Sequence, residues 1–266
     1  MSRISLELKD KVTLITGGSR GIGAETVRLF TGAGARVVFN YRQARERAEA
    51  LVDECGGPER CRAVEQELDA PEAGKALVEA AVATFGRLDF LVANHGIWPP
   101  EGAPISRMTD EQWRRTMAVN LDAVFGLVRA AAAHMVPGAA GASAEGTDGR
   151  CIVLISSTAG QRGEAFHADY AASKGALISL TKSLSSELAP QGIRVNCVAP
   201  GWVATEMSAP SVADPVLGPK IAATIPVGRV ATPREIAGPV LFLCTPLAGF
   251  ISGEVLNVNG GAVLMG

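Results

Sequence analysis

The sequence contains few of the residues that mark a disulfide framework, a metal centre or a nucleic-acid surface. Its five cysteines are odd in number and include no C-x-x-C pair, so neither a disulfide framework nor a structural zinc site is expected. The three histidines are scattered without metal-ligand spacing. Lys and Arg number 25 against 27 Asp and Glu, and no basic block is present, which argues against nucleic acid as a partner. We therefore expect a metal-free protein from a reducing cytoplasm.

Long uninterrupted hydrophobic runs are also missing. The first twelve residues, MSRISLELKDKV, are charged and lack the apolar core of a signal peptide. The longest uncharged run, residues 236–253, contains Gly238, Pro239, Pro246 and Gly249, which would break a membrane-spanning helix. We expect this run to be buried in a cytoplasmic protein that makes no membrane contact.

Expected strands and helices alternate along the chain. Short β-branched runs predict strands, and alanine-rich periodic runs predict helices between them. Strands are expected at 11–16, 36–40, 88–93, 151–156 and 193–198, and helices at 21–31, 42–54, 71–85, 110–134 and 169–188. This order predicts an α/β fold, a single-domain Rossmann-type doubly wound parallel sheet with helices on both faces, over residues 1–266. We expect a dinucleotide-binding half at about 8–150, a catalytic half with the substrate loops at about 151–266, and a flexible surface loop at the glycine-rich stretch 136–150.

A glycine-rich turn, TGGSRGIG at residues 16–23, follows the first expected strand and opens the first helix. Gly17 suits a tight turn, Gly21 leaves room for a ligand against the backbone, and Gly23 lets the helix pack closely on the strand. Free amides at the start of the helix would then face a pyrophosphate. A glycine turn without a ligand is the alternative, but the position at the first strand–helix turn favours a dinucleotide site.

The end of the second strand favours NADP(H) over NAD(H). An NAD site uses a carboxylate at this place to bind the ribose 2′-hydroxyl. This chain instead reads Phe39-Asn-Tyr-Arg42, with no acid until Glu46. Arg20 and Arg42 offer guanidinium groups, which suit a 2′-phosphate. The alternative is that Arg42 only begins the following helix as a solvated charge.

Tyr170 and Lys174 lie four residues apart in the stretch YAASK, which places them on one face of a helix. Alone, the pair would be taken for a surface contact of little consequence. A phenol with its ordinary pKa of ~10 is a poor acid–base group near neutral pH, and a neighbouring ammonium lowers that pKa. Ser157, 13 residues earlier, and the glycine turn favour a catalytic interpretation.

These motifs together resemble the short-chain dehydrogenase/reductase family over nearly the whole chain. The shared order is TGGSRGIG, Asp69 after the third strand, ANHG at 93–96, Asn120 in MAVNLD, Ser157 in ISSTAG, the Tyr170–Lys174 pair and PGWVAT at 200–205. The resemblance includes bacterial members that reduce 3-oxoacyl groups on a carrier protein. It implies an oxidoreductase that interconverts a ketone and a secondary alcohol by hydride transfer, with a tyrosine as acid–base group.

The resemblance also implies roles for individual residues. Tyr170 would protonate the substrate oxygen, and Ser157 would hold that oxygen as charge develops. Lys174 would tune Tyr170 and bind the nicotinamide ribose, and Asn120 would order a water leading from the lysine to solvent. The implied cofactor contacts are Gly17, Ser19, Arg20, Gly21, Ile22, Gly23, Tyr41, Arg42, Asp69, Asn94, Gly96, Tyr170, Lys174, Pro200, Gly201, Val203 and Thr205. Singly, some have structural alternatives: Asp69 could cap the helix that begins near Pro71.

The chain departs from the family near the expected nicotinamide site. The family usually has N-N-A-G where this chain has Ala93-Asn-His-Gly96. His95 is expected to be a pocket wall, a backbone hydrogen-bonder or a pH-sensitive contact, and His167 to shape the substrate loop 159–169. The aromatic residues expected to wall the pocket are Trp98, Phe166 and Trp202.

The substrate prediction depends on basic surface residues that this chain lacks. Carrier-protein reductases of the family present basic residues to an acidic carrier, but the corresponding places here, 134–137 and 184–187, contain no arginine. We therefore expect an NADPH-dependent carbonyl reductase for free small ketones. The alternatives are a 3-oxoacyl-carrier-protein reductase and, remotely, a non-catalytic dinucleotide-binding regulator. The resemblance further implies a homotetramer, and the proline-containing stretch 202–229 is expected to be a mobile lid.

Overall fold

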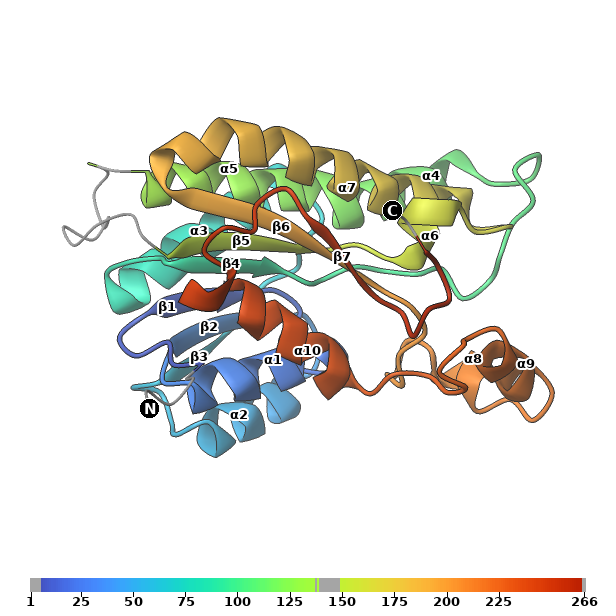
Figure 1. Cartoon of the computed structure of the whole chain (residues 1–266), viewed down its shortest axis with the longest axis horizontal. Helices are drawn as coiled ribbons and strands as arrows, with labels where there is room; N and C mark the ends of the chain where they lie inside the picture. Colours follow the sequence, from blue (N-terminus) through green and yellow to red (C-terminus); the bar gives the residue numbers. More distant parts are fainter. Residues whose placement is uncertain (1–5, 137, 139–148, 265–266) are drawn as a thin grey trace.

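A computed structural model describes residues 6–136, 138 and 149–264, and it shows one parallel seven-stranded sheet between two layers of helices (Figure 1). The order across the sheet is β3-β2-β1-β4-β5-β6-β7, and all neighbouring strands are parallel. The strands are β1 (Val12–Ile15), β2 (Arg36–Tyr41), β3 (Cys61–Glu65), β4 (Phe90–Ala93), β5 (Arg150–Ile155), β6 (Ile193–Pro200) and β7 (Val255–Val258). The Rossmann-type α/β fold expected from the sequence is confirmed.

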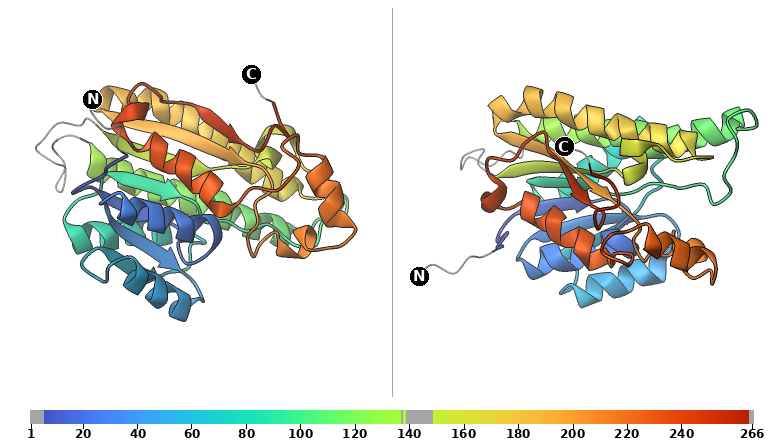
Figure 2. Two further views of the ribbon diagram at one scale, coloured as in Figure 1. Left: turned by 60° about the horizontal axis from the view of Figure 1, so that its bottom comes forward. Right: turned by 45° about the vertical axis from the view of Figure 1, so that its right-hand side comes forward.

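The helices divide between the two faces of the sheet, as the views in Figures 1 and 2 show. Because successive strand residues point to opposite faces, Ile15 packs with the layer of α1, α2 and α10, whereas Leu14 packs with the layer of α3, α5 and α7. Both faces are therefore apolar, as expected for a parallel sheet. The helices are α1 (Gly21–Gly32), α2 (Arg45–Glu54), α3 (Pro71–Phe85), α4 (Asp110–Met117), α5 (Ala123–Met135), α6 (Thr158–Arg162), α7 (Ala168–Leu188), α8 (Ala209–Val212), α9 (Leu217–Ala223) and α10 (Pro233–Leu243).

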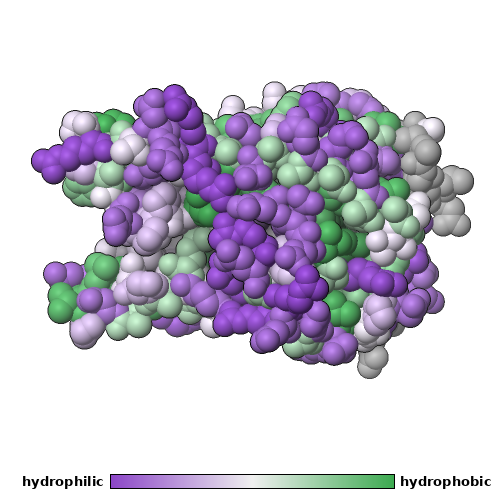
Figure 3. Space-filling model, turned by 180° about the vertical axis from the view of Figure 1, so that it is seen from behind, coloured by the Kyte–Doolittle hydropathy of each residue, from purple (hydrophilic) through white to green (hydrophobic). Residues whose placement is uncertain are grey.

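The strand order reverses at β1, which has β2 on one side and β4 on the other. The chain therefore leaves the carboxyl ends of these strands in opposite directions, and a crevice forms between the two connections. In the space-filling view a hollow opens at the side of the molecule, beside the lobe that carries α8 and α9 (Figure 3). This geometry places a ligand site at the carboxyl ends of the central strands.

The long helix expected at 110–134 is interrupted. One π-helical turn, Ala118–Asp122, separates α4 from α5 and contains the buried Asn120. Such turns are frequent at functional sites. The whole run Asp110–Met135 is long and apolar enough to span a membrane by composition, but half of its most apolar window is buried inside the protein, which is typical of a core helix. The surface loop expected at 136–150 lies largely outside the described residues.

The stretch expected to be a lid, residues 202–229, contains the two short helices α8 and α9, which the sequence did not predict. Both lie beyond the carboxyl ends of the strands as a separate lobe (Figure 1). Within the stretch, the Ser208 hydroxyl donates to the carbonyls of Val203 and Thr205. These bonds stabilise the turn at 203–208, just before α8.

Candidate active site

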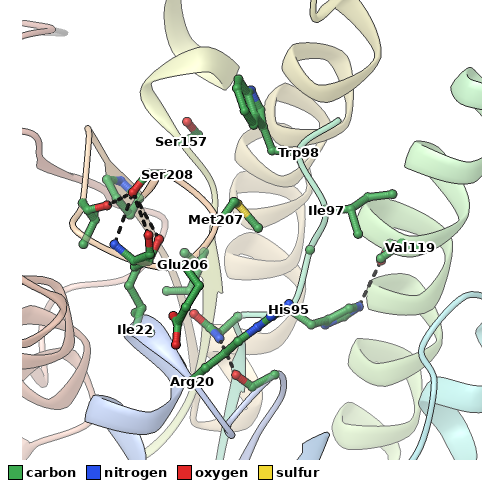
Figure 4. A pocket seen from close by; sticks show the side chains of 18 of the residues that line it. Arg20, Ile22, His95, Ile97, Trp98, Val119, Ser157, Glu206, Met207 and Ser208 are labelled. Carbon is green, nitrogen blue, oxygen red and sulfur yellow. Dashed lines mark hydrogen bonds between the residues drawn. The ribbon is translucent and has the colours of Figure 1, made fainter. Parts of the chain in front are cut away.

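A cavity of about 380 Å³ lies at the carboxyl ends of the central strands, and Figure 4 shows part of its wall. Ser157 lines it, as do most residues expected to contact the cofactor: Gly17, Ser19, Arg20, Gly21, Ile22, Tyr41, Arg42, Asn94, Gly96, Tyr170, Lys174, Pro200, Gly201, Val203 and Thr205. Three predicted site residues, Gly23, Asp69 and Asn120, do not line it. One continuous cavity thus joins the glycine turn to the tyrosine and lysine.

The glycine turn has the backbone that an anion site requires. Gly17 and Gly21 have positive φ values of 64° and 54°, which other residues rarely adopt. The Gly17 amide donates to Asn40 Oδ1 over 2.8 Å, which fixes the turn against the end of β2. Helix α1 begins at Gly21 without a side-chain cap, so its first amides are available to a phosphate. This cradle fits the pyrophosphate of a dinucleotide.

Gly23 serves the packing of the turn. An ideal Cβ at this position would lie 2.1 Å from the Gly17 carbonyl oxygen and 2.8 Å from Asn94 Nδ2. No side chain fits in that space. The contact with the cofactor expected for Gly23 is therefore indirect, through the shape of the turn.

The far end of the cavity carries two arginines and a glutamate. Arg42 Nη1 lies 3.2 Å from Glu67 Oε1, and Arg115 Nη2 lies 2.6 Å from the same oxygen. The bonds from Arg115 and Arg42 lower the pKa of the Glu67 carboxyl. All three side chains line the cavity. Sequence reasoning found Arg42 but missed Glu67 and Arg115, because α4 is distant from β2 and β3 in the sequence.

Asp69, which the family resemblance implies as a cofactor contact, does not line the cavity and pairs with Arg115 over 3.3 Å. The contact of Asp69 with the cofactor stays a prediction. Strand β3 ends at Glu65, and the residues that follow it directly, 66–68, line the cavity. This strand is short and only partly buried, so its end carries little signal in the sequence.

The predicted catalytic residues converge from two elements. Ser157 follows β5 as the N-cap of α6, and Tyr170 and Lys174 lie in α7. The Lys174 ammonium donates to the Ile155 carbonyl over 2.9 Å and lies 5.8 Å from the centre of the Tyr170 ring. These residues place a hydroxyl, a phenol and an ammonium around one end of the cavity.

The pKa of Tyr170 moves opposite to the sequence-based expectation. Burial raises the pKa of Tyr170 to about 12, and the hydrogen bond with the Ser157 side chain works against this rise. The expected lowering by Lys174 is not seen, because its ammonium is turned toward Ile155. Burial also lowers the pKa of Lys174 to about 8. The tyrosine is therefore protonated at neutral pH and able to donate.

Asn120 lies behind the cavity wall and ties three segments together. Its Nδ2 donates to the Ile97 carbonyl and to Ser173 Oγ, and its Oδ1 accepts from the Ile97 amide over 2.8 Å. The π-helical turn, the loop after β4 and α7 are thereby fixed to one another. The water relay expected at Asn120 stays a prediction.

His95 is a half-buried pocket wall with a defined protonation state. Its Nε2 lies 3.0 Å from the Val119 carbonyl and must donate, so its Nδ1 accepts from Thr16 Oγ1 at 2.8 Å. Burial, with a smaller contribution from Lys174, lowers the pKa of His95 to about 3. The pH-sensitive role considered for His95 is therefore not supported near neutral pH. Within the described ranges, no group of three His, Cys, Asp or Glu side chains could hold a metal ion.

The substrate side of the cavity is aromatic and charged. Trp98 and Trp202 line it edge to face, with ring centres 6.5 Å apart. Phe166, the third expected wall, does not line it and is 60% exposed, because its positive φ of 69° turns the chain outward. Three lining residues that the sequence analysis did not single out are Arg162, Glu164 and Met207.

Known proteins resemble the chain over most of its length. A family described as enoyl-(acyl carrier protein) reductase matches residues 17–263. A 3-oxoacyl-[acyl-carrier-protein] reductase of Synechocystis sp. is 36% identical over 97% of this chain and 98% of its own length. An acetoacetyl-CoA reductase of Rhizobium meliloti is 38% identical over 94% and 98%.

Solved structures agree with these matches. A blue fluorescent protein from a metagenomic library, in complex with NADPH, has a TM-score of 0.85 and 35% identity over 97% of this chain and all of its own. A 3-ketoacyl-(acyl-carrier-protein) reductase from Brucella melitensis, complexed with NADH, has a TM-score of 0.85 and 32% identity over 98% and 100%. Agreement of this extent in sequence and fold identifies the chain as a member of the short-chain dehydrogenase/reductase family of oxidoreductases, similar to its 3-oxoacyl-carrier-protein reductases.

Proposed function

We propose that this oxidoreductase uses NADPH to reduce a 3-oxoacyl thioester carried on acyl carrier protein. The observation that carries the proposal is the end-to-end similarity to reductases of 3-oxoacyl thioesters, combined with Ser157 and Tyr170 beside the substrate side of the cavity. These relatives favour the carrier-linked substrate over the free small ketone expected from the sequence. On this proposal, basic residues outside 134–137 and 184–187 would have to meet the acidic carrier.

The residues of the chain would divide the chemistry in a simple way. When bound along the glycine turn, the dinucleotide would supply the hydride. The Ser157 hydroxyl donates to the substrate carbonyl oxygen and stabilises the negative charge that develops there. Tyr170, protonated at neutral pH, gives its proton to that oxygen. Lys174 would hold the ribose of the cofactor once its ammonium turns from Ile155. A non-catalytic regulator would have no need for this arrangement.

The choice of NADPH is supported by charge. Arg20 and Arg42 line the cavity, and β2 ends without a carboxylate that would bind a ribose 2′-hydroxyl. Similar proteins have been solved with NADPH and with NADH, so this chain's own arginines carry the argument. A homotetramer in the cytoplasm, without nucleic-acid or membrane partners, stays a prediction.

The substrate is tested by measuring NADPH oxidation with a 3-oxoacyl group on acyl carrier protein and with a free ketone ester of the same acyl group. We expect kcat/KM to be at least ~10-fold higher for the carrier-bound group, because the carrier adds contacts outside the cavity. An enoyl thioester on the same carrier serves as a control and should not be reduced. Equal or better turnover of the free ester would instead establish a carbonyl reductase.

Replacing Arg42 by Ala tests the cofactor. NADPH binding should weaken by ~10-fold or more, since a charge-assisted hydrogen bond contributes about 1.5–3 kcal/mol, while NADH binding should change little. Isothermal titration of both dinucleotides gives the two dissociation constants. Arg45→Ala is the matched control, because this neighbouring arginine is paired with Glu65 and does not line the cavity. An equal loss for both dinucleotides would refute a 2′-phosphate contact.

A further inference from the structure

The aromatic contact between Trp98 and Trp202 crosses the end of strand β5. Trp98 lies in the loop after β4, and Trp202 follows the end of β6. Strand β5 lies between β4 and β6 in the sheet. The two rings nevertheless meet edge to face, with centres 6.5 Å apart. Because Ser157 comes directly after β5, the rings meet close to the place where Ser157 would hold the substrate oxygen.

The register of the sheet places this contact beyond Ser157. When the pairing of β5 with its two neighbours is continued outward, Ser157 falls level with Gly96 and Pro200. Trp98 and Trp202 each come two residues further along the chain than these positions. Both rings line the cavity, and Figure 4 shows Trp98 and Ser157 toward the same end of it. The two tryptophans therefore close the cavity on the outer side of Ser157.

Trp98 is held in place from the loop before α7. Its indole Nε1–H donates to Glu164 Oε1 over 3.2 Å. One face of the ring stacks on His167, with centres 4.6 Å apart and an interplanar angle of 15°. His167 is only 8% exposed, and its Nε2 lies 3.0 Å from the Pro99 carbonyl, so the supporting ring is itself fixed. Trp98 cannot turn aside without losing a hydrogen bond and a stacking contact.

The ketone of a 3-oxo thioester carries two arms, and the two tryptophans affect them differently. The thioester arm leads to the carrier, a folded protein that cannot enter the cavity, so this arm must leave through the open side of the cleft. The alkyl arm then lies on the side that Trp98 and Trp202 close. A fixed wall discriminates against each added methylene, because the extra atoms must displace packed side chains.

We propose that Trp98 and Trp202 limit the length of the alkyl arm beside the reacting ketone, so that short 3-oxoacyl groups are reduced in preference to long ones. Trp98 is the specificity-determining residue, because its neighbours fix its ring. Its indole N–H is already bonded to Glu164, so the wall offers the alkyl arm apolar surface. This inference rests on the proposed function and names the members of the substrate class that fit.

Three variants test the wall. Trp98→Ala removes it. Trp98→Phe keeps a smaller ring that can still stack on His167, and so retains part of the wall if the alanine variant folds poorly. Trp113→Ala is the matched control, because Trp113 is the third tryptophan of the chain, lies in α4, is 38% exposed and does not line the cavity.

The measurement is kcat/KM for NADPH-dependent reduction of the 3-oxobutanoyl and 3-oxooctanoyl thioesters of N-acetylcysteamine. We expect the wild type to favour the shorter group by ~10-fold or more, and Trp98→Ala to lower this ratio by ~10-fold or more. Trp98→Phe should give an intermediate ratio and Trp113→Ala the wild-type ratio. Because the ratio is formed within each protein, a general loss of activity does not alter it, and titration with NADPH shows that each variant retains its cofactor site. A wild type that prefers the longer group, or an unchanged ratio in Trp98→Ala, would overturn the proposal.

Symmetrical ketones separate this inference from the proposed function. The two alkyl arms of 3-pentanone, or of 5-nonanone, are identical, so every orientation places one arm against the wall. If the wild type reduces neither thioester, the proposed substrate is wrong, and the ratio for these two ketones tests the wall instead. A preference for 3-pentanone that Trp98→Ala abolishes supports the wall, and equal ratios in both proteins refute it. Reduction of both thioesters without a length preference would refute the wall and leave the proposed function standing.

Discussion

Replacing Tyr170 by Phe will leave dinucleotide binding intact and lower the rate of ketone reduction by ~10²–10⁴-fold. The phenol is the proposed proton donor and is bonded to the Ser157 side chain, and a positioned general acid contributes a factor of this size. The variant loses one hydroxyl and retains its ring, so the cavity keeps its shape. The measurement is steady-state NADPH oxidation, with the dissociation constant of NADPH from fluorescence titration.

The matched control for this variant is Tyr41→Phe. Tyr41 is the only other tyrosine, and its hydroxyl lies 3.3 Å from Glu65 at the opposite end of the cavity. Its replacement should change NADPH affinity at most modestly and leave kcat within about 3-fold of the wild type. Near-normal rates in Tyr170→Phe would show that another group protonates the substrate.

Replacing Gly23 by Ala should damage both the stability and the cofactor site. The new Cβ would meet the Gly17 carbonyl oxygen at 2.1 Å, so the turn must open. Overpacking of this kind costs about 1–3 kcal/mol, which lowers Tm by roughly 2–12 °C in a protein of this size. We also expect the Kd for NADPH to rise ~10-fold or more. Thermal unfolding and dinucleotide titration measure the two effects.

Gly32→Ala provides the comparison, because Gly32 ends the same helix and an added Cβ there meets no atom within 4 Å. This variant should be as stable as the wild type or more stable by about 0.5–1 kcal/mol, since alanine favours the helix. Its NADPH affinity should not change. If the two alanine variants behave alike, the close packing of the glycine turn has no functional importance.

The sequence predicts those elements whose signals are local. Helix α3 occurs at the expected residues, with Pro71 in its first turn and Gly86 in a left-handed conformation just after its end. The glycine turn was equally clear, since a β-branched strand precedes it and a periodic helix follows. Ser157, Tyr170 and Lys174 were found because motif spacing preserves their mutual position.

The sequence could not reveal features that depend on contacts between distant segments. The π-helical turn at Asn120 is stabilised by hydrogen bonds to Ile97 and Ser173. The hydrophobic periodicity of residues 110–134 does not predict these bonds. Arg115 of α4 pairs with Glu67, so only the folded chain shows that Arg115 lines the cavity beside Arg42. The outward course of Phe166 follows from a backbone conformation that is rare outside glycine.

The bonds around Thr16 have a consequence for how a dinucleotide reaches its site. Thr16 Oγ1 accepts hydrogen bonds from the amides of Asn94 and His95. The His95 ring also bonds to Thr16 Oγ1 and to the Val119 carbonyl, so the glycine turn, the loop after β4 and the π-helical turn form one hydrogen-bonded unit. In the described part of the chain, no hydrogen bond or ion pair joins residues 202–229 to this unit. Among the hydrogen bonds and ion pairs of the described residues, the exposed Arg47–Glu206 pair joins that segment to α2. We therefore expect the cleft to open on the side of α8 and α9, so that substitutions in that segment would change the rate of cofactor release more than substitutions of Ser157 or Tyr170 would.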